Sequence, residues 1–379
     1  MESKQSIMEN MVNFKKLFGD VYKDKKVLIT GHTGFKGSWL ALWLSAMGAD
    51  VYGFALKNED SPNHIDLLKL PIQQKYGDIT ELGALDKYIQ EIQPEIVFHL
   101  AAQALVKKSY SDPVETFSTN VMGTLHLFEA CRKTNSVKAL INVTSDKCYE
   151  NKEWNWGYRE NEPMGGYDPY SASKACSEIV TASYRSSYFN IEKYKESHEV
   201  LIASGRAGNV IGGGDWAADR LIPDIARATS KNEMVKIRNP KATRPWQHVL
   251  EPLSGYLTLG WHLLEQKINY AQAWNFGPDI YSNLPVDEIT ELSKTHWNDI
   301  KIEFSKDPND QHEAHLLMLD CSKAYKLMKW KPVWGIDKTL EKTIGWYRDY
   351  YVSGKIETGN HLTDYVNDAC KANLSWTTH

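Results

Sequence analysis

The sequence predicts an α/β protein built on a doubly wound parallel sheet, with a second and smaller domain towards the carboxy terminus. Three observations support this prediction. Short runs rich in β-branched residues alternate with segments of helical length through the first half of the chain. A glycine-rich loop directly follows the first of these runs, and beyond Asn209 the chain changes to clusters of Gly, Trp, Pro and Arg. Strands separated by helices favour right-handed βαβ units and therefore parallel strands.

The expected elements can be placed in order along the chain. Lys26–Thr30, "KVLIT", is a short β-rich run, and "GSWLALWLSAMG" after it has a helical spacing that ends at Gly48. Further strands are expected within residues 50–56, 95–102, 138–145 and 199–210, and a late one at Ala273–Gly277. The tail from about Val286 is expected to be helical. We predict that residues 1–206 and 248–282 form one domain, and residues 207–247 and 283–379 the other.

Composition indicates a globular chain and excludes two classes of partner. The chain is 42% hydrophobic and 24% charged, as folded domains usually are. A net charge of −4, without a long run of Lys and Arg, excludes nucleic acid as the expected partner. The most apolar stretch, "SWLALWLSAMGADVYGFAL", is interrupted by Gly48 and Asp50. A helix followed by a strand explains it better than a membrane span.

The cysteines and the first residues indicate the compartment. The five cysteines are scattered, with no C-x-x-C pair and no metal-ligand spacing, so we expect no metal site and a reducing environment. The start, "MESKQSIMENMVNFKKLF", mixes charged with apolar residues and does not read as a secretory signal. We expect a cytoplasmic protein.

The loop "TGHTGFKGSWL" places Gly31, Gly34 and Gly37 between a strand and a helix. Such a tight turn lets the backbone approach a pyrophosphate at the helix amino terminus. The spacing G-x-x-G-x-x-G in this position predicts a dinucleotide site in a Rossmann-type domain.

Two further positions bear on the dinucleotide, and each has two possible readings. The second strand ends in "GFALKNED", with Lys57 where an acidic residue would bind the ribose 2′-hydroxyl of NAD. This position therefore does not separate NAD from NADP. In "GDIT", Asp78 either contacts the adenine or serves as a turn or helix cap.

Two further motifs carry proton chemistry. In "YDPYSASKACSE", Tyr170 and Lys174 lie four residues apart, on one face of an expected helix. A nearby ammonium group, together with a positive nicotinamide, would lower the pKa of the phenol and let it act as a base. The string "NVTSDKCYEN" puts Ser145, Asp146 and Lys147 directly after an apolar run. A dehydrogenase needs a hydroxyl there, but not an acid and an amine as well. Asp146 and Lys147 are therefore either an additional acid and base or a solvated charged pair.

Taken together, the glycine loop, "HLAAQ", "TSDK", the Tyr170–Lys174 pair and "RAGNVIGGGDW" resemble extended short-chain dehydrogenases/reductases that act on nucleotide sugars. The strings "GHTGFKGSWLALWL", "TSDKCYENKEW", "GYRENEPMGGYDPYSASK" and "RPWQHVLEPLSGY" are similar to the CDP-glucose 4,6-dehydratases of that branch. The resemblance extends from about Lys25 to about Tyr347.

The resemblance implies NAD as cofactor, CDP-glucose as substrate, and a homodimer or homotetramer without nucleic-acid, membrane or metal partners. It implies that the smaller domain binds the nucleotide sugar. The implied cofactor-binding residues are Gly31, Thr33, Gly34, Phe35, Lys36, Gly37, Asp78, Ile79, Leu100, Ala101, Ala102, Gln103, Asn120, Thr144, Tyr170, Lys174 and Arg206. The implied substrate-binding residues are Gln103, Ser145, Asn209, Arg220, Arg238, Arg244 and His315.

The resemblance also implies catalytic roles for Ser145, Asp146, Lys147, Tyr170 and Lys174. Tyr170 takes the proton of the 4-hydroxyl while hydride leaves C4. Asp146 protonates the 6-hydroxyl, and Lys147 removes the C5 proton, where the related dTDP-glucose enzymes have a glutamate. The alternatives are a nucleotide-sugar 4-epimerase, a 4,6-dehydratase of another nucleotide sugar, and a non-catalytic dinucleotide sensor.

Overall fold

The computed structural model describes residues 13–58, 62–237, 239–304 and 316–377. A seven-stranded sheet with the order β11-β6-β5-β4-β1-β2-β3 forms its centre, and every pairing in it is parallel. Its strands are β1 (Lys26–Thr30), β2 (Asp50–Ala55), β3 (Gln73–Tyr76), β4 (Ile96–His99), β5 (Ala139–Val143), β6 (Leu201–Ala207) and β11 (Ala273–Phe276). The predicted parallel sheet is confirmed, and so are the six strands expected from apolar runs. The sequence reading did not include β3, whose four residues are all exposed.

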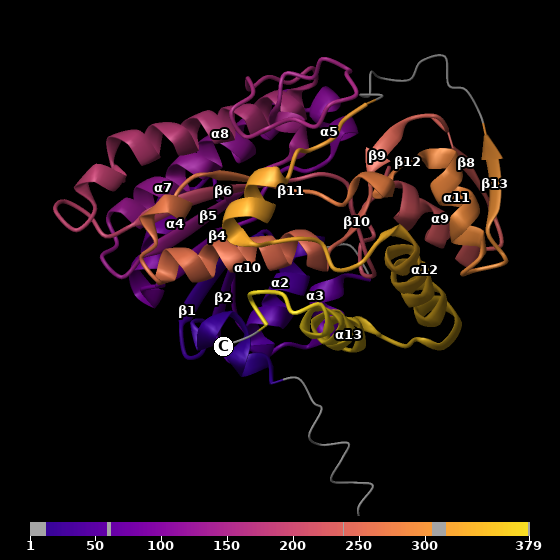
Figure 1. Cartoon of the computed structure of the whole chain (residues 1–379), viewed down its shortest axis with the longest axis horizontal. Coiled ribbons are helices and arrows are strands. Elements are labelled where there is room, and N and C mark those ends of the chain that lie inside the picture. Colours follow the sequence, from indigo (N-terminus) through magenta and orange to yellow (C-terminus); the bar gives the residue numbers. More distant parts are fainter. Residues whose placement is uncertain (1–12, 59–61, 238, 305–315, 378–379) are drawn as a thin grey trace, which may run out of the picture.

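Helices cover both faces of this sheet, as a doubly wound fold requires (Figure 1). Side chains of one face pack with α2 (Phe35–Ala46), α10 (Leu250–Leu264) and α13 (Thr358–Lys371). Side chains of the other face pack with α4 (Leu82–Ile92), α7 (Gly123–Arg132) and α8 (Pro169–Ser187). Shorter helices join these layers: η1 (Phe14–Asp20), α3 (His64–Leu68), α5 (Val106–Ser111), α6 (Pro113–Phe117), η2 (Ser118–Met122), η3 (Asp146–Cys148), η4 (Ile191–Lys193) and η5 (Ile268–Tyr270).

A separate apolar cluster lies in the part of the chain that follows β6, at the right of Figure 1. It contains Trp246, Trp297 and Trp346. The elements there are β7 (Val210–Ile211), α9 (Leu221–Ser230), β8 (Met234–Ile237), β9 (Thr243–Pro245), β10 (Gln247–His248), η6 (Ile280–Ser282), β12 (Asn283–Pro285), α11 (Val286–Lys294), β13 (Lys301–Phe304) and α12 (Ile336–Ser353). The expected helical tail is therefore only partly correct, because β13 pairs with β8.

The end of the chain returns to the sheet. Residues of η7 (Ala324–Met328), Trp330, Trp334 and α13 belong to the apolar cluster that contains β1 and α2. Trp376, near the end of the described chain, stacks on Phe18 of η1, near its beginning. The division into two domains stays a prediction, with these segments packed on the first. No helix within the described residues is both long and apolar enough to cross a membrane.

Candidate active site

The predicted functional segments begin at one edge of the sheet. Thr30, His99, Asn142 and Ser204 are register neighbours across β1, β4, β5 and β6. The segments that follow these strands therefore start side by side at their carboxyl ends. The strand order reverses between β1 and β4, which is where doubly wound sheets bind ligands.

Two of the three glycines in the loop are packed too tightly to carry a side chain. Gly31 has φ +80°, and a Cβ there would lie 2.6 Å from the Ala101 nitrogen. A Cβ on Gly37 would lie 2.1 Å from the Gly31 oxygen. Gly34, by contrast, is exposed and precedes α2 as its amino-terminal cap. Close packing of two glycines thus holds the third at the surface, where a phosphate can approach the helix terminus.

The neighbouring cofactor candidates have partners within the protein. The Thr33 hydroxyl donates to the Leu56 oxygen (3.1 Å). Asp78 accepts from the Thr80 nitrogen (2.8 Å), which supports its reading as a turn residue and leaves the adenine contact a prediction. Ile79 is buried against Gly123, where a Cβ would lie 2.5 Å from its Cδ1.

Ser145, Asp146 and Lys147 follow the end of β5, where the short helix η3 begins. Ser145 caps η3, and its hydroxyl donates to Asp146 Oδ1 (3.0 Å). The same hydroxyl lies near Tyr170 and lowers the pKa of its phenol. Asp146 is 2% exposed, which excludes the solvated charged pair as a description of this carboxylate. Lys147 is half-buried next to it.

Tyr170 and Lys174 lie on α8, as predicted, and both side chains are buried. Burial raises the pKa of Tyr170 to about 12, with Asp146 adding to the rise, while Ser145 and the charge of Arg220 lower it. Burial lowers the pKa of Lys174 to about 8. Within the protein alone, burial therefore outweighs the lowering of the Tyr170 pKa that the sequence led us to expect.

Lys36 of the glycine loop belongs to the same electrostatic environment. Burial lowers its pKa to about 8; the charge of Asp146 raises that pKa, whereas Arg220 and Lys174 lower it. The structure thus brings the glycine loop, the strand end and α8 together. Phe35 beside it packs on the apolar core.

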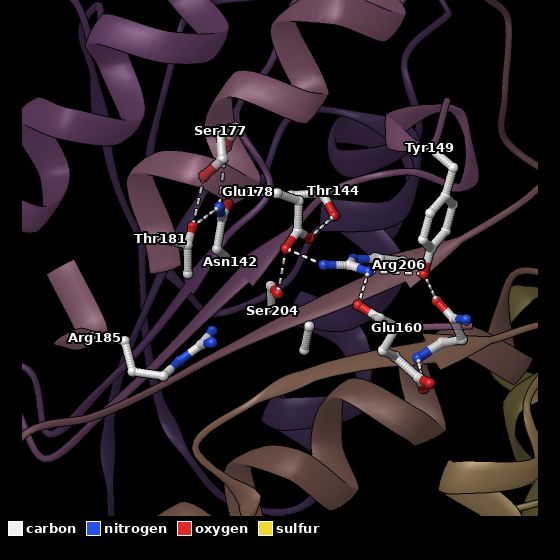
Figure 2. A network of polar contacts seen from close by, with 12 residues as sticks. Asn142, Thr144, Tyr149, Glu160, Ser177, Glu178, Thr181, Arg185, Ser204 and Arg206 are labelled. Carbon is white, nitrogen blue, oxygen red and sulfur yellow. Dashed lines mark hydrogen bonds and ion pairs between the residues drawn. The ribbon is translucent and has the colours of Figure 1, made fainter. Parts of the chain in front are cut away.

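Arg206 and Thr144, two further cofactor candidates, belong to a buried polar network behind the strand end (Figure 2). The Glu178 carboxylate accepts from Arg206 Nη2 (2.8 Å), from the Thr144 hydroxyl (2.5 Å) and from the Ser204 hydroxyl (2.8 Å). Arg206 Nη1 donates to the Tyr149 hydroxyl (2.7 Å). These contacts direct Arg206 to the protein interior, and a cofactor contact for it stays a prediction.

The segment after β4, which includes Leu100 to Gln103, is braced from within. The Gln103 amide donates to the Thr116 hydroxyl (2.8 Å) and accepts from the Leu105 nitrogen (2.6 Å). Asn120 accepts from the Gln103 nitrogen (2.9 Å) and donates to the Ser173 hydroxyl (2.8 Å). Gln103 and Asn120 thereby tie this segment to α8, and their ligand contacts stay predictions.

The other predicted substrate residues belong to the part of the chain that follows β6. Arg220 pairs with Asp215 (2.6 Å) and interacts with Tyr170. Arg244 is buried in β9, next to Pro245. Gly208 links this strand to the acid: a Cβ on Gly208 would lie 2.8 Å from Pro245 Cγ and 2.8 Å from Asp146 Oδ2. Asn209 accepts from the Gln247 nitrogen through its backbone oxygen (3.2 Å). Arg238 and His315 lie outside the described residues.

The sequence reading missed two buried polar groups near this site, Glu178 and Tyr256. Glu178 stands one turn beyond Lys174, on the face of α8 that also buries Ser173 and Ser177. A polar residue on the buried stripe of a helix was the available signal. Within the described residues, no group of three or more His, Cys, Asp and Glu side chains is arranged to hold a metal ion.

Comparisons with known proteins agree with this geometry. Residues 28–343 match the family model described as GDP-mannose 4,6 dehydratase. A CDP-glucose 4,6-dehydratase of Salmonella typhimurium is 49% identical over 351 residues, which are 91% of this chain and 97% of that relative. A UDP-glucose 4-epimerase of Thermotoga maritima has a TM-score of 0.72 at 21% identity, covering 86% of this chain and 99% of the other.

A dTDP-glucose 4,6-dehydratase of Bacillus anthracis, solved in complex with NAD, has a TM-score of 0.70 at 21% identity, covering 86% of this chain and 97% of the other. The two structural likenesses show the shared fold. The match to the family model spans most of the chain and confirms the resemblance seen in its motifs. The chain therefore belongs to the GDP-mannose 4,6-dehydratase family.

Proposed function

We propose that this protein is a CDP-glucose 4,6-dehydratase, a lyase that converts CDP-glucose to CDP-4-keto-6-deoxyglucose and water. The observation that carries the proposal is the placement of Asp146, a buried carboxyl group bonded to Ser145 beside Tyr170. An oxidation at C4 needs only the tyrosine, the lysine and the serine. An acid at the same strand end allows a hydroxyl group to leave as well. The Salmonella relative named CDP-glucose 4,6-dehydratase supports the choice of reaction and of nucleotide.

The cofactor in this proposal is NAD. The cradle formed by Gly31, Gly34 and Gly37 suits a pyrophosphate, because the close packing of Gly31 and Gly37 leaves Gly34 exposed at the start of α2. When bound, NAD supplies an acceptor for the C4 hydride and later the same hydride for C6. Its positive nicotinamide would also favour the ionised form of Tyr170, opposing the effect of burial.

In the first half of the reaction, Tyr170 accepts the proton of the 4-hydroxyl while the hydride leaves C4, which becomes a ketone. Lys174 stabilises the negative charge on the phenol, and Ser145 orients the reacting oxygen. The ketone then acidifies the C5 hydrogen, so that a weak base is able to remove it.

In the second half, Lys147 takes the C5 proton and Asp146 gives a proton to the 6-hydroxyl. The C6–O6 bond breaks, water leaves, and a C5–C6 double bond forms. Hydride returns to C6 and a proton to C5. The proton that Tyr170 accepted balances the one that Asp146 donated, so the net change is the loss of water.

The test is incubation of the pure protein and NAD with CDP-, dTDP-, GDP- and UDP-glucose. We expect a 4-keto product from CDP-glucose, with deuterium at C5 when the reaction runs in deuterated water. An inverted 4-hydroxyl without loss of water would identify a 4-epimerase instead. Preference for another nucleotide would identify a different 4,6-dehydratase, and no turnover of any substrate would favour a dinucleotide sensor.

We further propose that two copies associate through α6, η2 and α8, to form a homodimer or a tetramer of two dimers. Val114, Phe117, Met122 and Ile179 are exposed large apolar side chains on these packed helices. Covering them would remove apolar surface from water. Light scattering on the wild type and on Ile179→Glu tests this, with a monomeric wild type as the contradicting result.

All five cysteines are free in the structure, which supports a cytoplasmic location.

A further inference from the structure

Tyr256 is a fully buried tyrosine of α10 whose hydroxyl lacks a hydrogen-bond partner within the described residues. Asp146 Oδ2 is buried in the same condition, although Ser145 bonds the other oxygen of that carboxyl group. Buried polar atoms are rarely left unsatisfied, because each such atom loses its hydrogen bonds to water. The Tyr256 hydroxyl and Asp146 Oδ2 therefore each need a hydrogen-bond partner, and one partner could serve both.

The missing side chain of Gly205 leaves room for the Tyr256 ring against the sheet. Gly205 of β6 is the register neighbour of Val143, which is three residues before Asp146. A Cβ on Gly205 would lie 2.7 Å from both Cδ1 and Cε1 of the Tyr256 ring. The ring therefore occupies the space that any other residue at position 205 would fill.

The direction of α10 orients the Tyr256 side chain towards the carboxyl edge of the sheet. Val249, just before the helix, donates to the Ile211 oxygen (2.8 Å), so α10 starts beyond the carboxyl end of β6. Side chains in a helix lean towards its amino terminus, and Tyr256 therefore leans towards the active-site edge. The charges of Tyr170 and Asp146 add to the effect of burial in raising the pKa of Tyr256, which places its hydroxyl within their electrostatic reach.

We propose that Tyr256 is a positioning residue for Asp146, with its hydroxyl donating to Oδ2 through one buried water molecule. Both atoms are polar and buried without a hydrogen-bond partner in the described residues, and one water molecule between them would satisfy both. Ser145 then fixes one carboxyl oxygen and Tyr256 the other. This inference rests on the proposed function, since it assigns the support of the acid that protonates O6 as the C6–O6 bond breaks.

The test compares Tyr256→Phe with Tyr22→Phe. Tyr22 is a similarly buried tyrosine against α10, but its hydroxyl already has a partner, because it donates to the Leu257 oxygen (2.5 Å). Both variants are mixed rapidly with NAD and CDP-glucose, and the near-ultraviolet absorbance of reduced cofactor is followed together with 4-keto product.

We expect Tyr256→Phe to slow water elimination about tenfold, as the loss of one ordinary hydrogen bond would. C4 oxidation should proceed, so that reduced cofactor accumulates, whereas Tyr22→Phe should show the wild-type course. In an Asp146→Asn background, Tyr256→Phe should add no further loss, because the two side chains act as a unit.

The inference would be overturned by normal elimination in Tyr256→Phe or by an equal loss of oxidation and elimination. Additive losses in the double variant would do the same. Failure of the proposed function itself would look different, since the wild type would then form no 4-keto product from CDP-glucose.

Discussion

Glu178 follows Lys174 by one turn of α8, and its carboxylate holds Arg206 of β6 in a buried ion pair of 2.8 Å (Figure 2). Burial alone would raise the pKa of Glu178, but Arg206 and the hydroxyls of Thr144 and Ser204 lower it further than burial raises it. The resulting negative charge opposes the burial that lowers the pKa of Lys174. The Glu178 carboxylate thus joins α8, the helix that carries Tyr170 and Lys174, to β6.

We predict that Glu178→Gln destabilises the protein by about 3–5 kcal/mol, because it leaves the Arg206 charge buried without its partner. Urea unfolding at neutral pH measures the change. The matched control is Glu199→Gln, which breaks the exposed pair with Lys138 and should leave the stability close to that of the wild type. Equal costs for the two substitutions would contradict the structural role of the buried pair.

Much of the sheet could be predicted, because six strands are apolar runs that end in turns. The exception, β3, has the sequence "QQKY" and pairs with β2 at the edge of the sheet, exposed to solvent. Nothing in its pattern separates it from a loop. The strand β13 was hidden in the same way, since three of its four residues are exposed.

The site was predictable where the spacing is local and unpredictable where partners are distant. Four residues on a helix place Tyr170 beside Lys174, and the end of an apolar run places Ser145 at the sheet edge. The pairing of Glu178 with Arg206 spans 28 positions, and the Tyr256 ring packs in the space left by Gly205, 51 positions away. Such contacts depend on tertiary packing, which no local pattern contains.

Tyr170→Phe should lower turnover by about a hundred- to ten-thousand-fold, because it removes the group that accepts the 4-hydroxyl proton. NAD binding should change little, since the glycine loop keeps its backbone and Lys174 its charge. Steady-state kinetics and cofactor titration measure the two effects. Wild-type formation of the 4-keto product in this variant would refute the role of the phenol.

Arg244→Ala should raise the KM for CDP-glucose more than it lowers kcat. A group that binds the diphosphate contributes equally to the ground state and the transition state. Arg227→Ala, which removes a half-exposed partner of Asp224 on α9, is the control and should leave both constants near wild type. An unchanged KM in Arg244→Ala would show that its burial in β9 serves the fold alone.

Glu251 of α10 should make stability depend on pH. Burial raises its pKa to about 7, although the Trp334 and Val333 nitrogens and the Tyr365 hydroxyl lower it by donating to the carboxylate. The folded state therefore keeps a proton that the unfolded state has lost between about pH 4.5 and pH 7. This contribution is complete below the unfolded value and disappears as the pH rises through 7.

The expected loss is on the order of 3 kcal/mol between pH 4.5 and 7.5. Glu251→Gln cannot titrate and should lack this part of the pH dependence. Guanidinium unfolding of both proteins across that range measures it. Parallel pH curves for the two proteins would show that Glu251 does not titrate in this window.

Asp146 and Lys147 distinguish a dehydratase from every simpler enzyme of this fold. Asp146→Asn keeps the shape of the side chain and its bond from Ser145, but it cannot give a proton to the leaving hydroxyl. Lys147→Ala removes the proposed C5 base and leaves Tyr170 and Lys174 in place. Each change should slow dehydration about a hundred- to ten-thousand-fold.

The two variants should nevertheless oxidise C4, because that step depends on other side chains. Mixed with NAD and CDP-glucose, each should therefore accumulate reduced cofactor, seen by its near-ultraviolet absorbance. In deuterated water the Lys147 variant should fail to exchange the C5 hydrogen. The Asp146 variant keeps the base and should still exchange it. If both variants dehydrate CDP-glucose at the wild-type rate, neither the buried acid at the end of β5 nor Lys147 takes part in the chemistry, and other groups must supply the acid and the base.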